Sequence, residues 1–161
     1  MAVDMFLELE GVDGESKDKQ FKDKIDIFSF SLGLSNQGAG HYGGGSGAGK
    51  AQITDISIGK LVDKSSANLY KFCYQGKHIK TGKVHIRKAA GEKALEYLKY
   101  EMDEVFITSV NTSDSAGGGI ANESISLNFS KIKVTYEVET DTGDKGPSPD
   151  VTINVKENTV S

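Results

Sequence analysis

Short segments in which apolar and polar residues alternate recur along most of this chain. A period of two places the apolar side chains on one face of a strand and the polar side chains on the other. The alternating segments lie at residues 5–9, 25–32, 52–61, 83–87, 124–129, 131–138 and 151–155. They are short and turn-forming residues are frequent between them, which is typical of an antiparallel sandwich or barrel.

Two segments raise the question of a helix. Residues 65–75 predict one short α-helix, with Ser65 as its N-cap, apolar residues at helical spacing and Gly76 as the stop. Residues 92–102 are ambiguous. Their residue types favour a helix, but their alternation also fits a strand that continues into the β-rich residues 105–107.

Glycine is unusually frequent and clustered. The chain has 161 residues, of which 37% are hydrophobic, so we expect a single domain over residues 1–161. It contains 19 Gly but only 2 Pro, and the glycines cluster at residues 38–49 and 117–119. Because patterned segments flank both clusters, we expect long Gly-rich loops inside the domain.

Charge and cysteine content exclude several classes of protein. Lys and Arg total 19 against 23 Asp and Glu, and the only arginine is Arg87, so a nucleic-acid partner is not expected. The single cysteine, Cys73, excludes an intrachain disulfide framework and a multi-Cys zinc site. No segment approaches the roughly 18 apolar residues of a membrane helix, and residues 1–10 lack a signal-peptide pattern. We therefore expect synthesis in the cytoplasm, no membrane insertion, and export only by a route that reads no cleaved leader.

The Gly-rich stretch matches two nucleotide-binding motifs. Residues 44–50 satisfy seven positions of the phosphate-binding loop, but Ala51 stands where Ser or Thr should hold magnesium. Residues 38–43 match the dinucleotide fingerprint, and no helical pattern follows either match. A stretch this rich in Gly matches such motifs by chance, so we favour a mobile loop that becomes ordered against a partner.

Candidate catalytic residues are scattered. His41, His78 and His85 lack the close spacing of a metal site. Cys73 could form a thiol dyad with His78 or His85, but it lies on the apolar face of the predicted helix, where an inert cysteine is commoner.

The carboxylate pairs do not form a site either. Asp103 and Glu104 are adjacent and would point to opposite faces of a strand, and Glu137 and Glu139 are typical of a solvated sheet edge. General acid–base chemistry needs a cleft, which the sequence does not show. We therefore predict no enzyme activity, no metal and no cofactor.

The order of segments is more specific than any of these motifs. It comprises a turn at residues 11–16, a Phe-rich strand at 25–33, a Gly-rich loop that ends in Gly49-Lys50, a helix start at 63–69, Gly76-Lys77-His78, and the stretch 86–91. This succession resembles the haemolysin-coregulated protein (Hcp) family, the inner-tube subunit of bacterial type VI secretion systems. The resemblance extends from Met1 to about Val155.

Some positions depart from the family. Phe30 and Leu32 stand where the second strand often carries Trp, and Ala67 stands where Pro is common. The tail from Thr140 onward matches least.

The resemblance implies a mostly β fold, a small antiparallel β-barrel with one short helix, and makes residues 92–102 a strand. It further implies that six copies form a ring and that rings stack into a hollow tube. The tube would be expelled with its spike by a contractile sheath, and effectors would be carried inside the ring. The secreted protein would need no ATP site, because the sheath supplies the force.

Residues 35–50 have the composition of a loop that becomes ordered when rings stack. We expect ring-to-ring contacts from this loop, with Gln37, His41, Tyr42 and Lys50 as the contact residues. Tyr42 offers amphipathic area, and Lys50 offers a charge for a carboxylate on the next ring. Two alternatives remain open: a free secreted β-barrel that binds a small ligand or host partner, and a nucleotide-dependent enzyme that uses Lys50.

Overall fold

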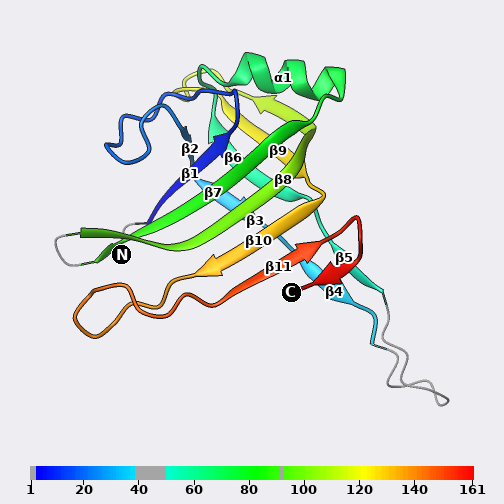
Figure 1. Cartoon of the computed structure of the whole chain (residues 1–161). Helices are drawn as coiled ribbons and strands as arrows, with labels where there is room; N and C mark the ends of the chain where they lie inside the picture. The colour runs from blue at the N-terminus through cyan, green and yellow to red at the C-terminus, as the bar shows by residue number, and fades with distance from the viewer. Residues whose placement is uncertain (1–2, 39–49, 91–92) are drawn as a thin grey trace.

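The computed structural model describes residues 3–38, 50–90 and 93–161. These residues form antiparallel strands and one short helix (Figure 1). The first strands are β1 (Val3–Leu9), β2 (Ile25–Ile27), β3 (Ser29–Ser31), β4 (Leu34–Asn36), β5 (Ala51–Ile53) and β6 (Ile56–Leu61). They are followed by α1 (Ser66–Gln75), β7 (Ile79–Ala90), β8 (Lys93–Ser113), β9 (Asn122–Asn128), β10 (Lys131–Tyr136), β11 (Asp150–Asn154) and β12 (Thr159–Val160). The expected mostly β fold with one short helix is confirmed.

The strands form two layers that share β8. The front layer has the order β12-β11-β10-β8-β7-β1-β2, and the back layer runs from β8 through β9 and β6 to β3. The first part of β8 pairs with β7 and β10, and its last part, from Phe106 to Ser113, pairs with β9. On the opposite side the chain passes directly from β2 to β3, so the two layers enclose one core (Figure 1).

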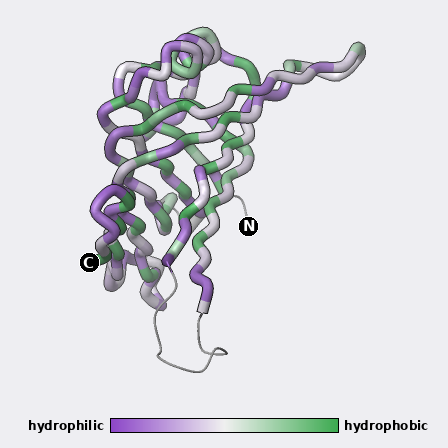
Figure 2. Tube along the Cα trace, turned by 90° about the vertical axis from the view of Figure 1, so that its right-hand side faces the viewer, coloured by the Kyte–Doolittle hydropathy of each residue, from purple (hydrophilic) through white to green (hydrophobic). Residues whose placement is uncertain are grey.

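The alternating segments fill the space between the layers. Ile56 and Ile58 on β6 face Leu127 and Ile125 on β9, and all four side chains are buried. Figure 2 shows the alternation of hydrophobic and hydrophilic residues along the strands. Leu69, on α1, is also fully buried, so the helix closes one end of the core. Among the described residues no helix is long and apolar enough to span a bilayer.

The segment expected as one strand over residues 25–32 is two strands. β2 pairs with β1 in the front layer, whereas β3 pairs with β6 in the back layer. Phe28 lies at the corner, where its backbone N–H donates to the carbonyl of Gly59 at 2.9 Å. Phe28 is consequently 54% exposed, whereas Phe30 packs against the core. The alternation in residues 25–32 predicts that Phe28, Phe30 and Leu32 share one face of a single strand, and for Phe28 this prediction was wrong.

The predicted helix is present, but its N-terminus differs from the expectation. Gly76 adopts a left-handed conformation with φ of 61°, and its N–H bonds to the carbonyl of Cys73, as expected for a Gly stop. The Ser65 side chain makes no capping hydrogen bond to the helix. Asp63 orders this turn instead, because its Oδ1 accepts hydrogen bonds from both the N–H and the hydroxyl of Ser65.

Residues 92–102 belong to strand β8 from Lys93 onward, as the resemblance implied. In β8, Leu98, Tyr100 and Met102 lie opposite β7 on one side and β10 on the other. The strand therefore forms against its helical propensity because two neighbouring strands supply its hydrogen-bond partners.

Candidate functional site

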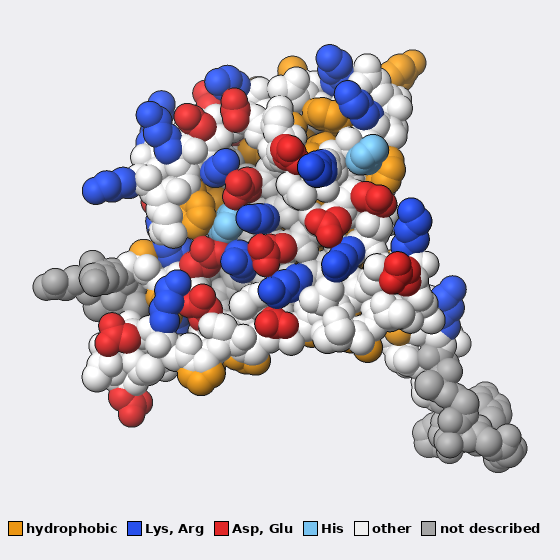
Figure 3. Space-filling view, in the orientation of Figure 1, with side chains coloured by type: hydrophobic (Ala, Val, Ile, Leu, Met, Phe, Trp, Pro, Cys, Tyr) orange, Lys and Arg blue, Asp and Glu red, His pale blue; other side chains and the backbone are white. Residues whose placement is uncertain are grey.

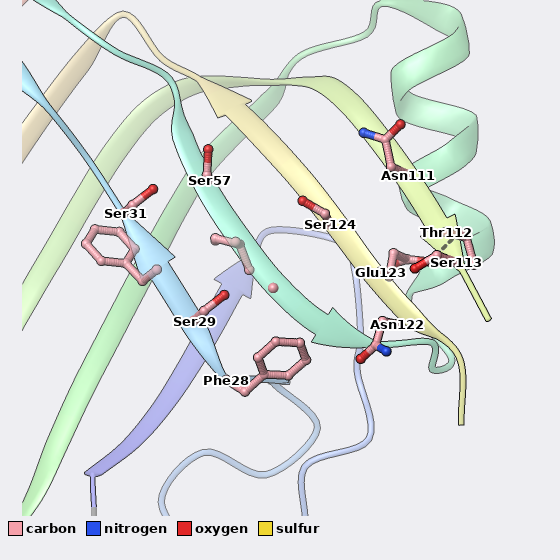
Figure 4. Close-up of a pocket in the computed structure, with 13 residues that line it drawn as sticks. Phe28, Ser29, Ser31, Ser57, Asn111, Thr112, Ser113, Asn122, Glu123 and Ser124 are labelled. Atoms are coloured by element: carbon pink, nitrogen blue, oxygen red, sulfur yellow. Dashed lines mark hydrogen bonds between the residues drawn. The ribbon is translucent and has the colours of Figure 1, made fainter. Parts of the chain in front are cut away.

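The outward surface of the back layer is lined by small polar side chains. Ser31 on β3 lies opposite Ser57 on β6, which in turn lies opposite Ser126 on β9. Figure 4 shows serine hydroxyls from three strands pointing to the same side of the sheet. They line a hollow of about 500 Å³. We define the serine face as Ser29, Ser31, Ser57, Ser113 and Ser124 with the neighbouring Asn111 and Asn122.

A glycine lets the corner residue lie across this surface. A Cβ atom at Gly59 would be 2.8 Å from the ring of Phe28. Without a side chain at this position, the Phe28 ring packs over β6 at the rim of the serine face (Figure 4). The result is a hollowed, mostly uncharged surface with the Phe28 ring at its edge.

The serine face offers hydrogen-bonding groups without a catalytic base. Among the described residues that line the hollow, the only carboxylate is Glu123, and no histidine is present. Glu123 is 2% exposed and points into the core. A serine nucleophile needs an adjacent base. This surface can therefore hold a partner through weak hydrogen bonds, but its geometry does not support nucleophilic catalysis.

Beneath one end of the serine face lies a buried ion pair. Lys60 on β6 and Glu123 on β9 occupy opposite positions of the two strands, and Lys60 Nζ lies 2.9 Å from Glu123 Oε1. Both side chains are fully excluded from solvent. Lys60 also lies 3.0 Å from the carboxylate of Asp63, and the hydroxyl of Ser66 donates to Glu123 at 3.2 Å. These contacts attach the start of α1 to the back layer.

The outward surface of the front layer is charged instead. Glu8, Lys83, Glu101 and Lys133 lie opposite one another on β1, β7, β8 and β10, so the sign of charge alternates across the sheet. Figure 3 shows this surface with cationic and anionic side chains intermixed. We call it the charged face. The molecule therefore presents two chemically different outward surfaces, one on each layer.

His85 is embedded at the side of the charged face. Its Nε2 lies 2.9 Å from Glu8 and its Nδ1 lies 2.7 Å from Glu96, and the ring packs on Phe21. Burial raises the pKa of both glutamates, but the hydrogen bond from His85 and the positive charge of nearby lysines outweigh it and hold each pKa below its ordinary value. Both ring nitrogens of His85 therefore have a carboxylate partner within the fold.

Arg87 fastens the segment 11–24 onto β1 and β7. Its guanidinium donates to Asp18 and to Asp4, each at 3.0 Å, and it lies over the rings of Phe6 and Phe21. Phe6 was expected on a polar face, but it is buried because Phe21 stacks on it at 4.6 Å. The hydrogen bond from Arg87 lowers the pKa of Asp18 to about 2.

We predict that the carboxylate of Asp18 makes the free energy of unfolding depend on pH. A lowered pKa means that Asp18 stabilises the fold above its unfolded pKa of about 4, and that this contribution disappears as the pH falls toward 2. At neutral pH, D18N should therefore unfold with about 1 kcal/mol less free energy than the wild type, allowing for solvent screening. Urea unfolding at a series of pH values should show that the difference in free energy of unfolding between the wild type and D18N decreases below about pH 4. A difference that stays constant with pH contradicts the prediction.

The residues expected at a ring contact fall on a projecting hairpin. β4 and β5 form a separate two-stranded sheet, which we call the arm, and it extends away from the body (Figure 1). Asn36 and Ala51 form the outermost pair of the two strands. Gln37 follows Asn36 and Lys50 precedes Ala51, so both lie at the same level of the arm, and both are exposed. His41 and Tyr42 lie outside the described residues.

The side of the arm contains a second hollow, of about 570 Å³. It lies between the arm and the C-terminal strands, and Leu34, Lys50, Ile53 and Val160 are among its lining residues. Lys50 thus borders a mostly apolar groove. Most of the phosphate-loop match lies outside the described residues.

The other chemical candidates are not brought together. Cys73 is half-buried, and the described residues contain no hydrogen bond between it and a histidine. Glu137 and Glu139 pair with Lys145 and Lys88. Across the described residues no group of His, Cys, Asp and Glu has the arrangement of a metal site.

Sequence reasoning missed the buried ion pair and the common surface of the serines. A signal for the first existed, because Lys60 continues the inward positions of Ile56 and Ile58, and Glu123 precedes Ile125 in the same phase. The serines were each assigned to the polar side of a strand. The alternation of residues does not specify which strands are neighbours in the sheet, so it does not predict that these serines share one surface.

Comparison with known proteins identifies the family. The family model described as "Type VI secretion system effector, Hcp" matches residues 6–136. The chain is 44% identical over 149 residues to protein hcp1 of Pseudomonas aeruginosa, with 92% of each sequence covered.

Solved structures agree in fold. The structure of a type six secretion system protein superposes with a TM-score of 0.93 at 26% identity, covering 99% of this chain and 100% of that one. Hcp1 from Salmonella typhimurium gives a TM-score of 0.80 at 31% identity, with both chains fully covered. This chain therefore belongs to the Hcp family of type VI secretion tube proteins.

Proposed function

We propose that this chain is the structural subunit of a type VI secretion tube. Six copies close into a ring, and rings stack into a hollow tube that is expelled with the spike by the sheath. The tube carries effectors in its lumen, and the chain acts through assembly rather than catalysis. The observation that carries this proposal is the contrast between the two layers, one with a hydroxyl-lined surface and one with a charged surface.

We place the serine face toward the lumen and the charged face toward the outside. Hydroxyls keep a surface wet and offer many weak hydrogen bonds, which suits cargo that must be held and later released. Alternating charges on the outside keep the surface soluble and can pair with groups on a surrounding sheath. This orientation also leaves the buried core between lumen and exterior.

The arm supplies a ring-to-ring contact in this proposal. Gln37 and Lys50 are exposed at the same level of the hairpin. Lys50 can meet a carboxylate of the next ring, as its charge suggests. We propose His41 and Tyr42, in the same segment 35–50, as further contacts to the next ring.

Site-directed gold labelling tests the orientation of the two faces. In a Cys73→Ser background, Ser57→Cys places a single thiol on the serine face and Lys83→Cys places one on the charged face. Electron microscopy of labelled rings should show the Ser57→Cys label around the central opening and the Lys83→Cys label on the periphery. The reverse pattern would contradict the orientation, and a labelled monomer would instead favour a free barrel that binds a ligand.

A further inference from the structure

Two segments of the chain carry opposite net charge. Residues 64–80 contain four lysines and no acidic residue, whereas residues 137–150 contain five acidic residues and one lysine. The first segment extends from just before α1 to the first two residues of β7, and the second comprises the connection from β10 to β11 and the first residue of β11. We call them the lysine end and the acidic end. Their net charges, +4 and −4, are equal in size.

The two ends lie at opposite ends of β7. The lysine end includes Ile79, the first residue of β7. At the other end of the strand, Lys88 forms an ion pair with Glu139 at 2.9 Å. Nine residues of extended strand separate these positions by about 30 Å. Figure 3 shows cationic side chains near α1 at the top and anionic side chains at the lower left, beside the β10–β11 connection.

The charges at both ends are available to a partner. Lys64, Lys71, Lys77 and Lys80 are exposed, and none has an ion pair within the described part of the chain. Glu137 and Glu139 are paired with lysines, but Asp141, Asp144 and Asp150 are exposed and have none among the described residues. The separation far exceeds a Debye length of about 8 Å, so the ends do not neutralise each other within one molecule.

Exposed tyrosines accompany the charges. Tyr74 on α1 is 95% exposed, and Tyr136, the last residue of β10 and next to the acidic end, is 44% exposed. Tyrosine supplies contact area at a small entropic cost. Both ends therefore have the composition of a surface that binds another protein.

We propose that the lysine end of one copy docks on the acidic end of a second copy in the next ring. The inference rests on the proposed ring assembly and deepens it, because it names the surfaces through which rings stack. The two surfaces differ, so the contact is head-to-tail and does not close on itself, which produces an open stack with one direction. Opposite charge steers the ends together and opposes head-to-head contacts, in which like charges would meet.

The test is a charge-swap experiment on purified rings. The Lys71→Glu and Lys77→Glu pair should reduce the fraction of rings in stacks at low ionic strength by about tenfold or more. Replacing all four lysines of the lysine end by Glu (Lys64, Lys71, Lys77 and Lys80) and the three exposed aspartates of the acidic end by Lys (Asp141, Asp144 and Asp150) gives the two ends net charges of −4 and +2. Both signs are then exchanged in one chain, and stacking should be restored. Lys19→Glu with Lys22→Glu changes the net charge equally on the 11–24 segment, and should leave stacking near the wild-type level.

Analytical ultracentrifugation at several salt concentrations provides the measurement. We expect wild-type rings to associate at low salt and to separate as salt screens the contact. If rings form but stack independently of salt, fail to stack at all, or respond equally to the control pair, the inference is overturned while the ring proposal stands. Absence of rings in the wild type would overturn the proposed function itself.

Discussion

Replacing Lys60 with Met lowers the free energy of unfolding by about 3–5 kcal/mol. The reason is the full burial of both members of the Lys60–Glu123 pair. Without the ammonium group, Glu123 remains in the core as a charge without a cation. Asp63 loses the same cation, so the attachment of α1 to the back layer weakens as well.

Two variants separate this effect from a general loss of charge. K83M removes an exposed lysine that lies 3.9 Å from Glu101, and should cost less than about 1 kcal/mol. K60M/E123L removes both buried charges and should be more stable than K60M alone, because an apolar pair leaves nothing unpaired. Urea unfolding followed by circular dichroism at fixed protein concentration checks all three variants. The prediction is contradicted if K60M lowers the free energy of unfolding no more than K83M does, or if K60M/E123L is less stable than K60M.

Joining β4 to β5 by a two-residue turn in place of residues 39–49 should leave the ring intact and reduce stacked tubes by at least about tenfold. The arm is a separate two-stranded sheet, so its outer part is not needed for the pairing of the main strands. Leu34 in β4 is 60% exposed and lines the mostly apolar hollow beside the arm, so the arm presents apolar area to a neighbour. Secretion should fall together with tube formation.

The matched control shortens a different Gly-rich loop. Removing Gly117 and Gly118 from the connection between β8 and β9 changes chain length without touching the arm. Light scattering should give the same ring mass for both variants, and electron microscopy should show tubes only for the control. Normal tubes from the arm variant would place the ring contact elsewhere.

The alternation of apolar and polar residues predicted the strands because each strand buries one face. It did not predict where a strand changes layer. Phe28, Phe30 and Leu32 are in phase, and no Gly or Pro marks the corner at Phe28. The corner arises because β2 pairs with β1 while β3 pairs with β6, and pairing is a property of the whole fold.

The burial of Arg87 and His85, and the partner of the buried Lys60, were further features that the sequence pattern does not predict. Arg87 and His85 occupy outward positions of β7, yet both are buried because the segment 11–24 covers them. That segment has no periodicity that would predict its path. Likewise, Lys60 and Glu123 are 63 residues apart, so only the pairing of β6 with β9 reveals that they meet.

For the candidate contact residues, the sequence and the structure also supply different information. Composition predicted a Gly-rich loop within residues 35–50, and the structure adds that β4 and β5, which flank the stretch outside the described residues, pair with each other. The register then brings Gln37 and Lys50 to one level of the arm. Their role in a ring contact remains a prediction.

The mass of the purified protein in solution is the most direct test of the tube-subunit proposal. Light scattering, combined with electron microscopy of the same chromatographic peak, should give six times the mass of the 17.3 kDa chain and ring-shaped particles. A monomer at every practical concentration would contradict the proposal, and would direct attention to the hollow beside the arm as a ligand site.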